Sequence, residues 1–247
     1  MNTFNLKSKS INALFWSALQ AFSSQGVTFV VSIILARILS PSDFGLVAMV
    51  MVFVVIGEAI INSGLSQSLI RNKEVSNSEY SSVLLFNIII SILIYSIFFI
   101  VAPYISDFYN QPLLKNIIRI YFVVFIIKSF SIVQNTILIK SLNFKSYFVV
   151  TLPSVILGGV SGLFFAINGY GVWSLVYSAI IQSLAETIQY WLVSKWRPNR
   201  DIKFSIVKSH FRYGYKLTLS SFINAILSNF QSILIGKYFS PKLVGIF

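Results

Sequence analysis

Three ionisable residues lie inside strongly apolar stretches of the sequence: Glu58, Lys128 and Glu186. A charged side chain at membrane depth costs at least a few kcal/mol unless it is paired or faces water. Residues three, four or seven positions away share the same helix face. At those positions the three charges have polar neighbours: Asn62 for Glu58, Ser131 and Asn135 for Lys128, and Gln182 and Gln189 for Glu186. Such stripes either pair with one another to hold helices together or line a wet cavity.

The apolar stretch nearest the N-terminus carries another polar stripe, with its members at intervals of four. We predict that all these stripes converge on one wet cavity at the centre of a helix bundle. The candidate cavity residues are Gln20, Ser24, Thr28, Glu58, Asn62, Lys128, Asn135, Gln182, Glu186 and Gln189. Our hypothesis is that Lys128 contacts an anionic part of a substrate in this cavity. The alternative is that Lys128 pairs with Glu58 or Glu186 and only holds the bundle together.

Cations also stand at the ends of apolar stretches. Arg37 follows the first stretch, and Arg71 and Lys73 follow the second. A cation in such a place can meet a phosphate that enters or leaves a cavity, so these three residues are candidates for a gate or a phosphate contact. The alternative is that they anchor the helix ends at the membrane surface.

The composition identifies the class of protein that positions these side chains. Hydrophobic residues make up 56% of the 247 residues and charged residues only 11%, against about 25% charged residues in soluble proteins. The apolar residues gather in runs of about 20, the length that crosses a bilayer as a helix. We predict spans at 14–35, 44–65, 83–102, 117–139, 148–167, 172–193 and 217–235.

The formal net charge of +12 is unevenly distributed over the two sides of the predicted membrane. Most Lys and Arg residues fall on the side of the N-terminus, and the other side holds only Arg37, Lys115, Arg119, Lys237 and Lys242. This bias predicts a cytoplasmic N-terminus. Because the largest basic cluster is a connector that faces an anionic leaflet, we expect membrane lipids and not nucleic acid as its partner.

Part of the sequence occurs twice. Arg37, Ser40, Pro41 and Gly45 correspond to Lys237, Ser240, Pro241 and Gly245 at one constant offset, each set just after an apolar span. The polar stripe Gln20, Ser24 and Thr28 corresponds to Ser220, Asn224 and Ser228 at the same offset. An even number of spans separates the copies, which indicates parallel repeats related by an axis along the membrane normal.

The fold class that follows is an all-α membrane protein, a polytopic transmembrane helical bundle. We predict a six-helix N-terminal bundle at 1–194, a basic cytoplasmic connector at 195–216 that is an interfacial helix or a solvated linker, and the start of a second bundle at 217–247. On this reading the 247 residues are the N-terminal half of a longer protein. A complete seven-helix protein is the alternative.

Five motifs, "LARILSPSDFGLVAM", "LSQSLIRNKEVS", "SLNFKSY", "NGYGVWSLV" and "SKWRP", occur in this order along the chain. As an ordered set they resemble the Wzx-type flippases of the polysaccharide transport family, in particular the WzxC-like colanic-acid exporter branch. The resemblance runs from about residue 14 to the end. It implies two six-helix bundles that rock around a central cavity in the bacterial inner membrane. The implied substrate is an undecaprenyl-pyrophosphate-linked oligosaccharide of O-antigen, capsule or exopolysaccharide synthesis, with polysaccharide polymerase and glycosyltransferases as possible partners.

Three other functions stay open. A multidrug exporter of the same superfamily moves cations and is favoured by a cavity in which the carboxylates outnumber the cations. A scaffold for glycan-assembly enzymes would use the basic connector for docking. An enzyme is not expected, because the outer connectors offer Asp43, Asp107, Lys115 and Arg119 without a histidine. With no cysteine and one histidine, we predict neither a metal site nor a cofactor, and a coupling ion, H⁺ or Na⁺, stays open.

Overall fold

The computed structural model describes residues 3–61, 64–238 and 241–245 of the chain, and over these ranges it contains helices and no strand. The helices are α1 (Thr3–Ile38), α2 (Pro41–Ile61), α3 (Leu65–Arg71), α4 (Asn77–Tyr109), α5 (Pro112–Tyr121), α6 (Val123–Ser129), α7 (Ile132–Lys140), α8 (Phe144–Ile167), α9 (Val172–Val193), α10 (Phe204–Tyr238) and α11 (Pro241–Val244). The all-α polytopic membrane class predicted from composition is therefore confirmed.

A helix is present at each of the seven predicted spans, although not all of these helices are equally apolar. Within the described residues, four helices are long and apolar enough to cross a membrane: α1, α2, α4 and α8. A fifth span is formed if the bent pair Pro112–Ser129 and Ile132–Lys140 is counted as one. The polar residues of α9 and α10 lower their hydropathy, so a count of seven crossings stays a prediction.

The helices begin and end where local side-chain chemistry allows. At the start of α2, Ser40 Oγ donates to Asp43 Oδ2 (2.7 Å), and Pro41 occupies the first helical position, where no backbone N–H is needed. At the start of α4, Ser76 and Glu79 cap each other's backbone N–H groups. These caps place both helix starts firmly at the ends of the bundle.

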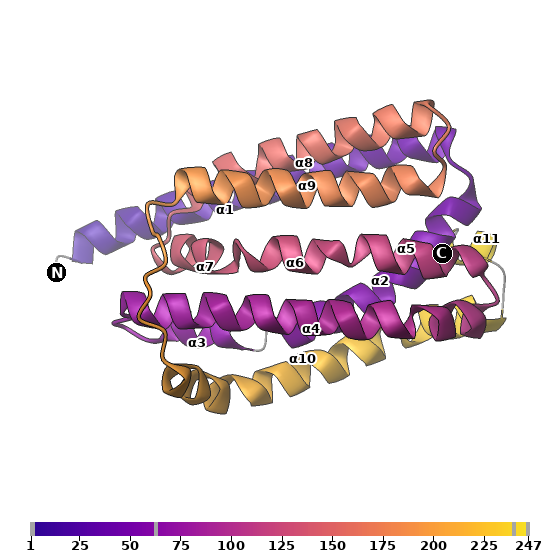
Figure 1. Ribbon diagram of the computed structural model, residues 1–247. Coiled ribbons are helices and arrows are strands. Elements are labelled where there is room, and N and C mark those ends of the chain that lie inside the picture. Colours follow the sequence, from indigo (N-terminus) through magenta and orange to yellow (C-terminus); the bar gives the residue numbers. More distant parts are fainter. Residues whose placement is uncertain (1–2, 62–63, 239–240, 246–247) are drawn as a thin grey trace.

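The chain runs back and forth between two ends of the bundle (Figure 1). The connectors 72–76, 141–143 and 194–203 lie at one end, here called the basic end, and the connectors 39–40, 110–111 and 168–171 lie at the opposite end. Helices α1, α8 and α9 form one layer, α5 to α7 run through the middle, and α2, α3, α4 and α10 form the other side (Figure 1). The alternation and the gathering of the basic connectors agree with the sequence analysis.

The predicted span 117–139 is not one straight helix. It consists of α5, α6 and α7, with a bend of 48° between Ser129 and Ile132. At the bend, both the backbone N–H and Oγ of Ser131 donate to the carbonyl of Lys128 (3.0 Å each). The bend places Lys128 in the last turn of α6, facing the interior.

The apolar core fills the half of the bundle nearer the opposite end. Its buried members come from α2, α4, α5, α6 and α9, and include Met49, Ile105, Ile117, Phe122 and Phe125. Conversely, large apolar side chains on the outside, such as Phe22, Ile167 and Leu192, are exposed, as expected for surfaces that contact lipid. A second buried apolar cluster lies nearer the basic end and contains Leu65, Leu69, Val83, Leu84 and Val133.

The predicted connector 195–216 consists of an extended part and a helical part in the structure. Residues 194–203 are extended and cross the basic end, and α10 begins at Phe204. The second part of the predicted connector 195–216 is therefore continuous with the predicted seventh span. The connector is held to the start of α4 by Asn199, whose N–H donates to Ser81 Oγ, and Lys203, whose N–H donates to Ser82 Oγ (both 2.9 Å).

Candidate functional site

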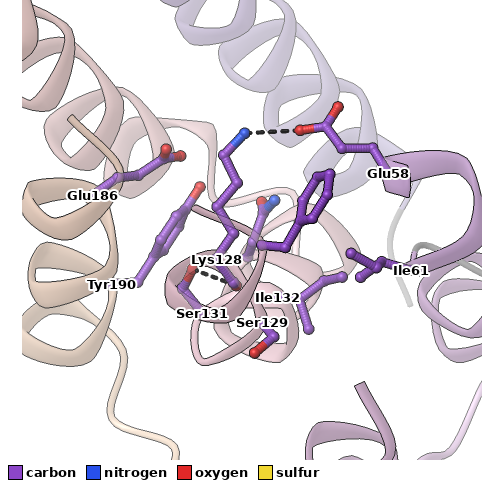
Figure 2. Close-up of a pocket in the computed structure, with 10 residues that line it drawn as sticks. Glu58, Ile61, Lys128, Ser129, Ser131, Ile132, Glu186 and Tyr190 are labelled. Atoms are coloured by element: carbon purple, nitrogen blue, oxygen red, sulfur yellow. Dashed lines mark hydrogen bonds and ion pairs between the residues drawn. The ribbon is translucent and has the colours of Figure 1, made fainter. Parts of the chain in front are cut away.

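The three intramembrane charges lie on three different helices that face one another. Glu58 is in the last turn of α2, Lys128 in the last turn of α6, and Glu186 on α9. Lys128 Nζ donates to Glu58 Oε1 at 2.9 Å, and Glu186 lies on the other side of the lysine (Figure 2). The structure thus contains one of the two ion pairs that the sequence analysis considered.

These charges border a cavity of about 200 Å³, here called the charged cavity. Its lining residues are Glu58, Ile61, Phe125, Lys128, Ser129, Ser131, Ile132, Asn135, Glu186 and Tyr190. The side chains of Lys128 and Glu58 are 47% and 38% exposed, so the ion pair lies at an open wall and is not sealed in a dry interior. The buried Oδ1 of Asn135 has no hydrogen-bond partner among the described residues. A polar atom of this kind normally binds water or a polar ligand.

The charged cavity contains more acidic than basic side chains. Glu58 and Glu186 provide two carboxylates, and Lys128 provides one ammonium group. With all three ionised, carboxylates outnumber cations, which is the balance that the sequence analysis associated with export of cations. The ammonium group of Lys128 has three N–H donors. Within the described part of the chain, it forms one hydrogen bond, to Glu58.

A second hollow, here called the lateral groove, lies between α2, α3 and α7 on one side and α10 on the other. It has a volume of about 620 Å³. Its polar lining residues are Glu58, Ser66, Gln67, Thr218, Ser221, Asn224, Ser228 and Asn229. Glu58 borders both hollows, because it stands in the wall between them. So many hydroxyl and amide groups along a groove are unusual in the membrane region unless the groove holds water or a polar ligand.

Of the predicted cavity residues, the structure brings Glu58, Lys128, Asn135 and Glu186 together around the charged cavity. Two others on α9 turn toward α8 instead. Gln189 Nε2 donates to Ser154 Oγ (2.8 Å), and Gln182 lies against the bare backbone of Gly158. These two glutamines join helices and do not line either hollow, so they correct the expected set.

The stripe on α1 also does not line the charged cavity or the lateral groove. Gln20 Nε2 donates to Ser24 Oγ (3.3 Å), and the exposed Thr28 donates its hydroxyl to the carbonyl of Ser24 (2.9 Å). These bonds stay within α1, which packs on α8 in the outer layer (Figure 1). Asn62, the remaining predicted cavity residue, lies outside the described residues.

The three candidate gate residues are at opposite ends of the bundle. Arg37 is exposed near the end of α1, and Arg71 and Lys73 are exposed at the basic end after α3. None of them lines the charged cavity. Lys140 Nζ donates to the carbonyls of Leu69 (2.9 Å) and Asn72 (2.6 Å) and thereby fixes the end of α3.

Sequence analysis missed Tyr190, Ser129 and the α3 residues Ser66 and Gln67. Tyr190 is one helical turn after Glu186, and its hydroxyl lies beside that carboxylate (Figure 2), so the same spacing rule would have found it. Ser66 and Gln67 were hidden because the predicted second span ran on to residue 65. Gly64, at φ +64°, leads into α3, which lies beside α10.

With this geometry in view, the chain can be compared with known proteins. A protein family described as "Polysaccharide biosynthesis protein" matches residues 34–247. The chain belongs to this family. No solved structure matches the chain significantly.

Three curated relatives show the range of this family. The chain is 26% identical over 243 residues to the succinoglycan biosynthesis transport protein ExoT of Rhizobium meliloti, covering 98% of this chain and 49% of that protein. It is 23% identical over 247 residues to the lipopolysaccharide biosynthesis protein WzxC of Escherichia coli, with coverage of 98% and 49%. It is 23% identical over 197 residues to the teichuronic acid biosynthesis protein TuaB of Bacillus subtilis, with coverage of 78% and 40%.

The chain spans about half the length of the curated relatives that it matches. The resemblance to polysaccharide exporters seen in the sequence motifs is therefore confirmed at the level of the family.

Proposed function

We propose that this chain is part of a polysaccharide exporter that moves an undecaprenyl-pyrophosphate-linked oligosaccharide from the cytoplasmic to the outer leaflet of the bacterial inner membrane. The observation that carries the proposal is the polar lateral groove inside an apolar bundle of the polysaccharide biosynthesis family. One matched relative is named a transport protein for succinoglycan, itself a polysaccharide. Export by alternating access, in which two bundles rock, is part of the proposal.

The sizes of the two hollows suggest different roles. Ligand pockets usually enclose about 300–1,000 Å³, a range that includes the lateral groove at about 620 Å³ but not the charged cavity at about 200 Å³. The groove is accordingly the place for sugar rings, whose hydroxyl groups match its serine, threonine and amide lining. The charged cavity holds water and the ion pair.

Lys128 has a defined role in this scheme. Its ammonium group contacts the pyrophosphate when the anionic head group reaches Glu58, the residue shared by the two hollows. Before that, Glu58 holds the ammonium group at 2.9 Å. Arg37, Arg71 and Lys73, exposed at the two bundle ends, contact the phosphate as it enters or leaves.

The orientation and the partners follow from the same proposal. The N-terminus is cytoplasmic, because the basic end of the bundle then faces the cytoplasm. Membrane lipids surround the exposed apolar helices. The supply of oligosaccharide involves glycosyltransferases and its use involves a polymerase, whereas a coupling ion, H⁺ or Na⁺, stays open. The protein is a transporter and not an enzyme.

A transport assay tests the proposal. The full-length protein is reconstituted in liposomes that contain undecaprenyl pyrophosphate linked to a monosaccharide with a nitrobenzoxadiazole label. We expect the label on the inner leaflet to become accessible to dithionite faster than in protein-free liposomes. Lys128→Ala slows this exchange, and Lys128→Arg retains it. Equal rates with and without protein would refute the proposal.

The excess of carboxylates in the charged cavity favours one second candidate, a multidrug exporter for organic cations. In the same liposomes, that function predicts transport of ethidium and no acceleration of lipid exchange. Transport of the labelled lipid without ethidium transport would exclude it.

A further inference from the structure

A third hollow, here called the interface pocket, lies at the basic end between α1 and the connector from α7 to α8. It has a volume of about 340 Å³. Asn12 and Trp16 of α1, Ser141 and Leu142 of the connector, and Lys145 at the start of α8 are among its lining residues. None of these five lines the charged cavity or the lateral groove, so the proposed export does not use the interface pocket.

The surroundings of the interface pocket are apolar and open. On the adjoining turns of α1, Ile11, Leu14 and Phe15 are 58%, 70% and 60% exposed. Leu142 is also exposed, although it lies in a connector, and its φ of +55° is uncommon for a bulky residue. Exposed apolar side chains beside a tryptophan at a helix end are typical of the boundary between lipid head groups and acyl chains. The pocket therefore opens at the level of the head groups.

The Lys145 ammonium group in this pocket lacks a protein partner of opposite charge. Its Nζ lies 5.7 Å from the ring centroid of Trp16. Three other cations, Arg119, Arg197 and Lys237, also lie over aromatic rings, but each of them donates a hydrogen bond to a backbone carbonyl. Among the described residues, Lys145 Nζ has no hydrogen bond and no carboxylate within 4.0 Å. Its charge and its three donors are therefore available to a ligand.

We propose that the interface pocket binds the phosphate group of an anionic phospholipid from the membrane leaflet at the basic end. The ammonium group of Lys145, the indole N–H of Trp16 and the amide of Asn12 supply the donors, and none of the three has a hydrogen-bond partner within the described part of the chain. The exposed side chain of Leu142 contacts the beginning of the acyl chains.

The charge around the pocket selects the class of lipid. A zwitterionic head group would bring its own cation beside Lys145, where no described carboxylate lies within 4.0 Å. The first ten residues of the chain add two lysines and no acidic residue. Basic pockets between membrane helices are known to bind anionic head groups, and the volume of about 340 Å³ is within the usual range for a ligand. This binding does not depend on the exported molecule, so the proposal stands apart from the proposed function.

Native mass spectrometry of the full-length protein in detergent tests the site, with short-chain phosphatidylglycerol added at increasing concentration. We expect Lys145→Gln to weaken the binding of one phosphatidylglycerol about fivefold, and Lys145→Arg to retain it. The matched control is Lys195→Gln, which removes the same charge from an exposed lysine at the basic end that lines none of the three hollows. Equal losses in Lys145→Gln and Lys195→Gln would reduce the effect to a general attraction and overturn the site.

A second variant tests the pocket without a change of charge. Ser141→Phe places a large side chain in the lining, so we expect it to weaken phosphatidylglycerol binding while Lys145 is still present. Undiminished binding in this variant would contradict the pocket as the place of binding.

Two competing ligands test which group is recognised. Phosphatidylcholine with the same acyl chains is expected to bind more weakly than phosphatidylglycerol, and equal binding would overturn the selection of anionic lipid. Glycerol 3-phosphate carries the phosphate without acyl chains. We expect it not to displace phosphatidylglycerol at equal concentration, and displacement would identify a free phosphate ester, in place of a lipid, as the ligand.

Discussion

Polar residues are used in two different ways on the two sides of this bundle. Where α8 meets α9 and α1, glycines let the helices approach closely, and polar groups bond across the gap: Ser178 Oγ donates to the carbonyl of Gly158 (2.7 Å), and Gln189 Nε2 donates to Ser154 Oγ (2.8 Å). Where α2 faces α6 and α10, the helices are less tightly packed, and their polar groups line the charged cavity and the lateral groove.

This difference shows that the polar groups of a stripe on an apolar helix can be satisfied in two ways. They can bond to a neighbouring helix, which requires small residues opposite them, or to water and solute, which requires a hollow. The glycines at 158, 159 and 162 on α8 provide the first environment. The bend beside Lys128 and the turn at Gly64 provide the second.

The largest expected effect comes from the ion pair. Lys128→Ala leaves Glu58 without its partner, and Glu58→Gln leaves Lys128 without its own. Because loss of one partner leaves the other charge unsatisfied within the membrane region, we expect each single change to lower stability by about 1–3 kcal/mol, and the double variant to lose less than the sum. Thermal unfolding in detergent measures this coupling.

Measurements of export distinguish a structural role of the Lys128–Glu58 ion pair from a role in transport. If the pair only joins helices, the double variant recovers export together with stability. Our proposal predicts that export stays low whenever Lys128 is absent, even in the stable double variant. Full export in Lys128→Ala at normal membrane abundance would contradict it.

The next effect concerns the tightly packed side. A side-chain carbon on Gly159 would lie 2.7 Å from Cγ2 of Val31, so Gly159→Leu pushes α1 away from α8. We expect a loss of stability of about 1–3 kcal/mol, with unchanged export per folded molecule. Val160→Leu is the matched control, because Val160 is 60% exposed on the outer surface. A loss of export at full stability would show that this side also takes part in transport.

Sequence patterns were sufficient for the all-α membrane class and for three charges inside apolar helices, because helical spacing and hydropathy determine these locally. They were not sufficient to assign Gln182 and Gln189. Both are at helical spacing from Glu186, but Gln189 meets Ser154 across a glycine-lined contact, and only the packing of α8 on α9 decides this.

The lateral groove illustrates the same limit. Ser66 and Gln67 become groove residues because the left-handed backbone at Gly64 directs α3 alongside α10. The sequence does show a fall in hydropathy at Asn62, Ser63 and Gly64, but the predicted span ran on to residue 65. The glycine itself was a local signal, but its partner, α10, is far away in the sequence.

A smaller effect compares two polar residues from the two environments. Gln189→Ala removes one bond between helices and is expected to cost about 0.6 kcal/mol, with little change in export. Asn135→Ala removes a cavity-lining group whose Oδ1 has no partner within the described chain, so stability is retained and export falls. Parallel unfolding and exchange measurements check both variants. Equal effects of the two changes on export would erase the distinction between the two sides.

The smallest expected effect compares equivalent positions in the two repeats. Ser228 lines the lateral groove, whereas its equivalent, Thr28, is exposed on α1. Removal of either hydroxyl, as Ser228→Ala or Thr28→Val, is expected to leave stability within about 0.5 kcal/mol. Ser228→Ala should lower export by about twofold, the effect of one lost hydrogen bond to a sugar.

Thr28→Val then tests the symmetry. If the second repeat is arranged like the first, α1 lies beside it as α10 lies beside α2 and α3, and the repeat then predicts a similar twofold fall. Lipid exchange by the full-length protein measures both variants. A fall in Ser228→Ala alone would mean that only one of the two repeats carries the sugar.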